Sequence, residues 1–176
     1  MKKIFAIALV ALSTSLSAFA QDATVLFTTF SGALNAPIFQ LDGTTPLDGT
    51  FIIGLCAGDS EGNLSLVAAT SAVSGYAFAG STTVTGLTPG ANAILQVKVW
   101  QGDSYETATV RGESSIFAVT TSGNPLDTPP AWTAGNDPVY STGFQSFSVM
   151  NAVPEPSTVA LGVIGGLGML LRRRKN

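Results

Sequence analysis

The sequence contains no histidine and a single cysteine, Cys56, among its 176 residues. The absence of histidine excludes Ser-His-Asp and Cys-His catalysis and any metal site built on imidazole ligands. One cysteine excludes an internal disulfide and a four-cysteine zinc site. Cys56 lies in an apolar segment without a basic neighbour in sequence, so we expect a buried thiol and not a nucleophile. These absences favour a protein that is not an enzyme and has no cofactor.

Charged residues are scarce, at 11% of the chain, and they are unevenly distributed. Six of the eight basic residues lie near the ends of the sequence: Lys2, Lys3, Arg172, Arg173, Arg174 and Lys175. Between residues 21 and 156, Lys98 and Arg111 face all eleven acidic residues, which gives this stretch a formal net charge of −9. Such an acidic body argues against nucleic acid or anionic lipid as a partner and favours cations or neutral glycans.

Residues 1–20 are typical of a secretory signal peptide. Two lysines precede an apolar run at residues 4–12, and a polar stretch then leads to Ala18 and Ala20. Small residues at these two positions fit the −3 and −1 subsites of signal peptidase, so we expect cleavage after Ala20 and export of the rest of the chain. An N-terminal membrane anchor is the alternative, but the apolar run is short for a span.

Residues 153–176 have the features of a second targeting signal. Pro154, Glu155 and Pro156 form a stiff, extended tripeptide, because each proline fixes its own φ and disfavours a helical predecessor. Residues 157–171 carry no charge, and the basic block Arg172, Arg173, Arg174 and Lys175 follows. A helix of this length spans about 22 Å against a hydrocarbon core of about 30 Å, so we expect a short transmembrane helix helped by snorkelling arginines. The positive-inside rule keeps the basic block cytoplasmic.

The order of these three parts resembles the PEP-CTERM sorting signal of Gram-negative bacteria, which is also described as an "ice-binding protein C-terminal" signal. The resemblance implies recognition and processing near the PEP motif by an exosortase, a membrane-embedded cysteine protease-transpeptidase. The implied partners during export are exosortase and signal peptidase, with the inner membrane as a transient location. The implied destination is the cell surface or an exopolysaccharide (biofilm) matrix, which makes exopolysaccharide a candidate partner. An ordinary single-pass anchor is the alternative, and it would leave residues 157–176 in the mature protein.

Residues 21–152 predict one all-β domain, an antiparallel β-sandwich of about eight short strands separated by Gly, Asp, Asn and Pro turns. Leu95, Val97 and Val99 fall on one face of the clearest strand, while Gln96 and Lys98 point the other way. We expect a helical turn at 105–111 and a long loop at 122–143. The expected strands are residues 24–30, 37–41, 51–57, 64–69, 81–85, 93–100, 115–121 and 144–150.

Two groups of residues are candidate ligand sites. Asp59, Glu61 and Asn63 place oxygen atoms at alternate positions, a weak candidate for calcium, although the spacing departs from the EF-hand loop and turn formation explains the same residues. The aromatic candidates are Trp100 and Trp132, with Tyr105 and Tyr140, whose rings suit stacking on sugars. We expect these residues to seal the sandwich edge. The alternative is that Trp100, which lies on the strand face opposite the apolar residues, faces solvent.

The sequence therefore predicts a non-enzymatic exported protein of the cell surface or the exopolysaccharide matrix. A carbohydrate-binding module that uses exposed aromatic residues is the first alternative. A polysaccharide-active enzyme is the second, but the acidic residues are scattered over turns and no local motif pairs two of them for glycoside hydrolysis. A regular threonine array on a repeat would be needed for ice binding, and the sequence has none.

Overall fold

The computed structural model describes residues 22–32, 34–124, 128–130, 132, 139–140 and 142–152. Within these residues every pairing between strands is antiparallel, and the one helical element is the three-residue 3-10 helix η1 (Glu61–Asn63). The prediction of an antiparallel, all-β, sandwich-like fold is therefore confirmed.

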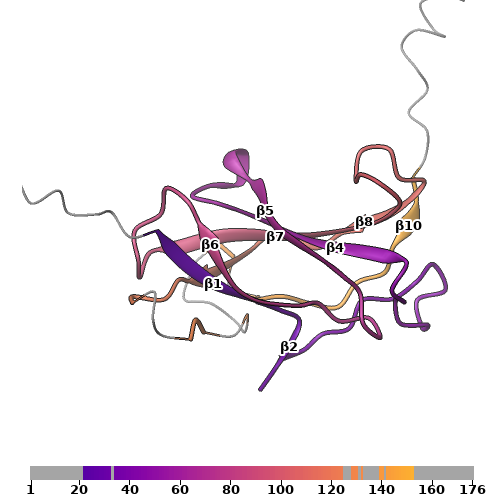
Figure 1. Cartoon of the computed structure of the whole chain (residues 1–176), viewed down its shortest axis with the longest axis horizontal. Helices are drawn as coiled ribbons and strands as arrows, with labels where there is room; N and C mark the ends of the chain where they lie inside the picture. The colour runs from indigo at the N-terminus through magenta and orange to yellow at the C-terminus, as the bar shows by residue number, and fades with distance from the viewer. Residues whose placement is uncertain are drawn as a thin grey trace, which may run out of the picture.

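The larger layer is a six-stranded sheet built around the pairing of β4 (Phe51–Gly58) with β7 (Asn92–Gln101). This pairing is continuous from Phe51 opposite Gln101 to Gly58 opposite Ile94. The sheet then extends outward on both sides, through β5 (Ser65–Ser71) beside β4, and through β8 (Val110–Glu113), β9 (Phe117–Thr120) and β10 (Met150–Asn151) on the side of β7. Figure 1 shows β4 and β7 running through the middle of the molecule.

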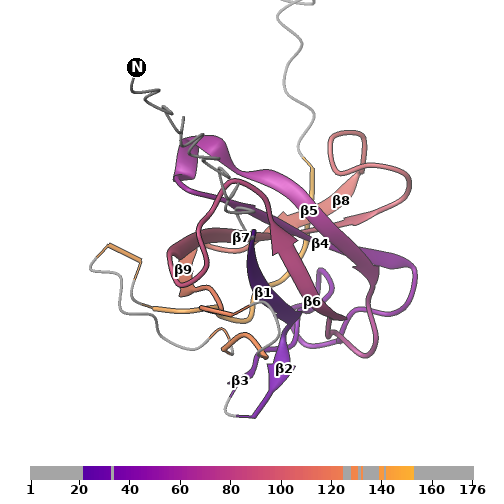
Figure 2. The ribbon, with the colours of Figure 1, turned by 60° about the vertical axis from the view of Figure 1, so that its left-hand side comes forward.

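The second layer consists of the ribbon formed by β1 (Ala23–Thr28) and β6 (Phe78–Val84), with the short hairpin β2 (Phe30–Ser31) and β3 (Leu34–Asn35) beside it (Figure 2). Alternate residues of β1 point inward, so that Val25 and Phe27 are fully buried. They share one hydrophobic core with inward side chains of β4 and β7, such as Leu55 and Val97. The core therefore lies between the ribbon and the larger sheet.

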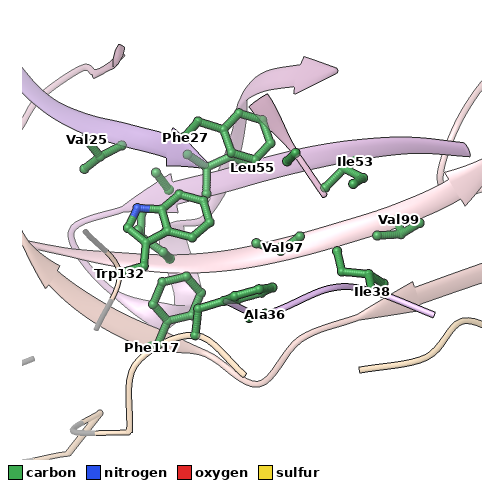
Figure 3. Close-up of a cluster of buried hydrophobic side chains, with 14 of the residues drawn as sticks. Val25, Phe27, Ala36, Ile38, Ile53, Leu55, Val97, Val99, Phe117 and Trp132 are labelled. Atoms are coloured by element: carbon green, nitrogen blue, oxygen red, sulfur yellow. The ribbon is translucent and has the colours of Figure 1, made fainter. Parts of the chain in front are cut away.

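Trp132 fills one end of this core, although no strand contains it. Its ring is fully buried and stacks on Phe27 at 5.7 Å between centroids with an interplanar angle of 18°. Phe117 and Phe144 contact it at 5.4 and 5.7 Å. Figure 3 shows Trp132 between Phe27 from one layer and Phe117 from the other. Trp132 thus joins the two layers through aromatic packing.

Most of the expected strands are present within one to three residues of their predicted bounds. The regions 51–57, 64–69, 81–85, 93–100 and 115–121 correspond to β4, β5, β6, β7 and β9. The region 24–30 divides into β1 and β2, because the Thr28 hydroxyl donates to the carbonyl of Phe30 and accepts from its N–H, which bends the chain.

Two expected strands are wrong, and two strands, β3 and β8, lie outside the expected ranges. The region 37–41 forms no strand; Phe39 makes isolated bridges to Pro46 and Ser148 instead. The region 144–150 is irregular until β10 begins at Met150. The expected helical turn at 105–111 is present in part, as the Ala108 N–H donates to the carbonyl of Ser104, but the strand β8 follows from Val110.

The burial of Trp132 predicts a large loss of stability on truncation. We expect Trp132→Ala to lower the free energy of unfolding by about 3–5 kcal/mol, because it leaves a cavity where two layers meet. Leu41→Ala, at a side chain that is 52% exposed, is the control and should change it by less than about 0.5 kcal/mol. Denaturant unfolding followed by circular dichroism measures both. Equal effects of the two substitutions would contradict the assignment of Trp132 to the core.

Candidate functional site

The face of the six-stranded sheet that points away from the core carries Trp100. The indole ring lies over Gly54 of the neighbouring strand, where an added Cβ would come within 2.7 Å of the Trp100 Cζ3 atom. Tyr105, in the loop after β7, packs edge-on against the ring at 6.3 Å and 88°. Trp100 is consequently only 6% exposed, and its Nε1 is buried with no hydrogen-bond partner in the described structure, so packing holds the ring in place.

Tyr105 is fixed by both of the basic residues of the described chain. The Lys98 ammonium and the Arg111 guanidinium lie 4.8 and 5.1 Å from the centre of its ring. Its hydroxyl donates to Glu113 Oε2 at 3.2 Å, and Arg111 Nη1 donates to the carbonyl oxygens of Tyr105 and Glu106 at 2.9 and 3.1 Å. Burial, and then the Glu113 carboxylate, raise the pKa of Tyr105 to about 12. The phenol therefore stays protonated at neutral pH and acts as a clamp that holds the loop on the sheet.

A hollow of about 280 Å³ lies beside this clamp. Its lining includes Trp100, Tyr105 and Leu66, with Cys56 in the strand below. Cys56 is buried, as expected, and desolvation raises the pKa of its thiol, so the thiol is not an activated nucleophile at neutral pH. The charged residues Lys98, Asp103 and Glu106 also line the hollow.

The proposed sugar-stacking role of the two tryptophans needs correction. Trp132 has no exposed surface, because the aromatic core encloses it. Trp100 lies on the outer face of its strand as predicted, yet the loop that carries Tyr105 covers it. The alternation of residues along the strand indicates which face Trp100 occupies, but the covering loop is a tertiary contact that no pattern in the strand reveals. Neither tryptophan offers an open ring face to a ligand.

Asp59, Glu61 and Asn63 lie together at the 3-10 helix η1, where each has a protein partner. The Asp59 carboxylate accepts hydrogen bonds from Asn63 Nδ2 and Ser60 Oγ, both at 3.0 Å, while Glu61 Oε2 accepts one from the Tyr140 hydroxyl at 3.0 Å. These contacts give the candidate calcium ligands a turn-forming role. In the part of the chain that the structure describes, no group of three or more acidic or cysteine side chains is placed to hold a metal ion.

Asp42 and Asp48 likewise organise the turns that lead into β4. Asp42 Oδ1 accepts from the backbone N–H groups of Thr44 and Thr45 at 3.0 and 2.8 Å, and Asp48 Oδ1 accepts from the N–H of Thr50 at 2.9 Å. The Thr45 hydroxyl also donates to Asp42. These hydrogen bonds, with that of the Thr45 side chain first, lower the pKa of Asp42 to about 2. Both carboxylates therefore serve the backbone of their own turns.

Three aromatic residues that the sequence pattern does not single out, two of them exposed and one half-buried, gather at the smaller layer. Phe30, Tyr76 and Phe78, which we call the aromatic patch, have ring centroids 5.3, 6.2 and 6.4 Å apart. Both phenylalanines are 50% exposed. The one sequence signal for this patch is the absence of any charged residue from 23 to 41 and from 64 to 97.

The described chain ends at Ala152, directly beyond β10. β10 pairs with β8 through Met150 opposite Arg111, and the Ala152 N–H donates to the carbonyl of Thr109 at 2.8 Å. The residues of the two targeting signals lie outside the described residues: Ala18, Ala20, Pro154, Glu155, Pro156, Arg172, Arg173, Arg174 and Lys175. Within the described ranges, no helix has the length and apolar character needed to cross a membrane.

The contact of Gly54 with Trp100 predicts that a single methyl group destabilises the sheet. Gly54→Ala should lower the free energy of unfolding by about 1–3 kcal/mol, because the rigid indole ring has to move. Gly62→Ala is the matched control, since a Cβ there meets no atom within 4 Å. Thermal unfolding compares the two variants, and tryptophan emission should shift to the red only in Gly54→Ala. A Gly54→Ala protein as stable as Gly62→Ala would show that the ring is not fixed there.

The hydrogen bonds of Asp42 predict a pH-dependent contribution to stability. The pKa of Asp42 is about 2 in the folded protein against 3.8 for an unperturbed aspartate, so its stabilising effect is complete above pH 3.8 and is lost as the pH falls towards 2. We expect the melting temperature of the wild type to exceed that of Asp42→Asn at neutral pH, and the difference to shrink over this acidic range. A difference that does not vary with pH would contradict this role of the charge.

Comparison with protein families finds the PEP-CTERM protein-sorting motif at residues 152–175. No curated protein and no solved structure matches the chain. The matched region begins at the residue that follows β10 (Met150–Asn151). In this way the C-terminal part of the sequence, with its prolines, uncharged segment and basic block, is identified: the chain carries a PEP-CTERM protein-sorting motif, the signal by which an exosortase recognises exported proteins of Gram-negative bacteria.

Proposed function

We propose that the β-domain is a non-enzymatic component of the cell surface or of the exopolysaccharide matrix, delivered through its sorting motif. The match to the PEP-CTERM motif carries this proposal, because the motif begins where the folded domain ends. The domain is thus the cargo that the motif sorts. The acidic character of the chain between its two basic ends suits a hydrated extracellular environment.

The electrostatics of the turns support a structural role over glycoside hydrolysis. A glycosidase needs one carboxyl group whose pKa is raised, so that it can donate a proton at neutral pH. Hydrogen bonds instead lower the pKa values of Asp42, Asp48 and Asp59. These three carboxylates are ionised at neutral pH and are occupied by the backbone and side chains of their own turns.

Processing of the full chain in an exosortase-containing Gram-negative host tests this proposal. The wild type should lose residues 157–176 and leave the membrane fraction for the surface or matrix fraction. Pro154→Ala/Glu155→Ala/Pro156→Ala should instead keep its C-terminal segment and stay with the membrane, since the signal that the exosortase reads is gone. Intact mass and cell fractionation measure both properties.

Asp103→Ala, which changes an exposed acidic residue of the domain, is the matched control and should be processed like the wild type. A wild-type product that retains residues 157–176 where exosortase is intact would contradict the sorting step. Release of reducing sugars from matrix extract by the purified protein would contradict the non-enzymatic role.

A further inference from the structure

The aromatic patch is a rigid feature of the smaller layer. Phe78 stands opposite Thr28 at the end of the β1–β6 ribbon, and Thr28 in turn makes both side-chain hydrogen bonds to the backbone of Phe30. Tyr76 donates its hydroxyl hydrogen bond to Asn35 Oδ1 at 2.7 Å. The rings also contact one another edge-on or tilted, at 50–68°. Each ring is therefore positioned by the backbone or by a polar partner, and the patch is built before any ligand arrives.

The stretches of chain that carry the patch contain polar residues but no charged residue. The strands that carry it belong to the stretches 23–41 and 64–97, in which there is no Lys, Arg, Asp or Glu. Along β6 the exposed side chains beyond Phe78 include Ser81 and Thr83, and Asn35 is exposed beside Tyr76. Acidic residues lie outside these two stretches of sequence, and Asp48 lines a hollow with Val73 and Ser74, two residues before Tyr76. Half-exposed rings flanked by hydroxyl and amide groups suit a ligand that has apolar C–H faces and many hydroxyls, and no charge.

The size of the patch argues against a second copy of the chain as its occupant. An aromatic side chain can bury about 150–250 Å² in all, so three partly exposed rings offer a few hundred Å² at most. A stable protein–protein interface needs about 800 Å² per partner. The patch is large enough for a few sugar units and too small for a dimer.

We propose that the aromatic patch of Phe30, Tyr76 and Phe78 binds uncharged polysaccharide. The rings stack on the C–H faces of the sugars, while Asn35 and the neighbouring hydroxyl groups hydrogen-bond to sugar hydroxyls. This inference rests on the proposed matrix function and names its ligand class. An anionic polysaccharide binds less well, because the body of the protein is strongly acidic.

Native affinity electrophoresis of the full chain in non-ionic detergent tests the site. The gels contain hydroxyethylcellulose, dextran or galactomannan as uncharged probes, and carboxymethylcellulose as the anionic counterpart. We expect at least one uncharged probe to retard the wild type, and carboxymethylcellulose to retard it less than hydroxyethylcellulose. Phe30→Ser/Phe78→Ser should weaken binding about tenfold or more, because two stacking rings are lost. Leu41→Ser, at an exposed aliphatic residue outside the patch, should bind like the wild type.

A second variant keeps the test valid if the double substitution impairs folding. Phe78→Trp enlarges one ring at a half-exposed position and should strengthen retardation, whereas Tyr76→Phe keeps the ring and removes the hydroxyl bond to Asn35. Thermal unfolding confirms that each variant is folded.

The proposal is overturned by a wild type that no uncharged probe retards, or by equal retardation of wild type and folded Phe30→Ser/Phe78→Ser. It is also overturned if light scattering shows a wild-type dimer that the double variant converts to monomer. Failure of the matrix function gives a different result, namely protein that never reaches the matrix fraction although its patch binds polysaccharide in the gel.

Discussion

The pairing of β4 with β7 is the interaction on which the rest of the structure depends. It is the longest continuous register of the molecule, from Phe51 opposite Gln101 to Gly58 opposite Ile94, and it gives the domain two different faces. Inward residues such as Leu55 and Val97 form the floor of the core. Outward residues such as Gly54 and Lys98 form the surface on which Trp100 and Tyr105 lie. β5, β8 and β9 then extend an already defined sheet.

The two faces are stabilised by different physical means. The inner face uses apolar burial, and its tightest part is the stack of Trp132 with Phe27, Phe117 and Phe144. The outer face uses one tyrosine, held by two cations and a carboxylate, to cover one tryptophan. Both basic residues of the domain are thus committed to a structural role, which leaves the remaining surface acidic or neutral. The strands that carry the aromatic patch contain no charged residue of their own.

The sequence predicts the features that depend on local patterns and misses those that depend on distant contacts. Alternation of apolar and polar residues predicts β4 and β7 well. The order of the PEP tripeptide, the uncharged segment and the basic block along the sequence predicts the sorting motif. The apolar character of residues 37–41 favours a strand, but Pro37 lacks the N–H that a strand interior needs. The structure has only isolated bridges there, at Phe39. Trp132 lies in a proline-rich stretch without periodicity, so its place in the core depends on tertiary contacts, such as the stack on Phe27 from the opposite end of the domain sequence. The aromatic patch is assembled in the same way, from two regions more than forty residues apart.

The backbone hydrogen bond at Ala152 has a consequence for the geometry of processing. Five residue-to-residue steps lead from Ala152 to Ser157, and the fully extended chain between them reaches no further than about 18 Å. Under the proposed processing near the PEP tripeptide, a membrane-embedded enzyme would work within this distance of the β8–β10 edge of the sheet. The length of the tether would then limit how far that edge can lie from the bilayer while the cut is made.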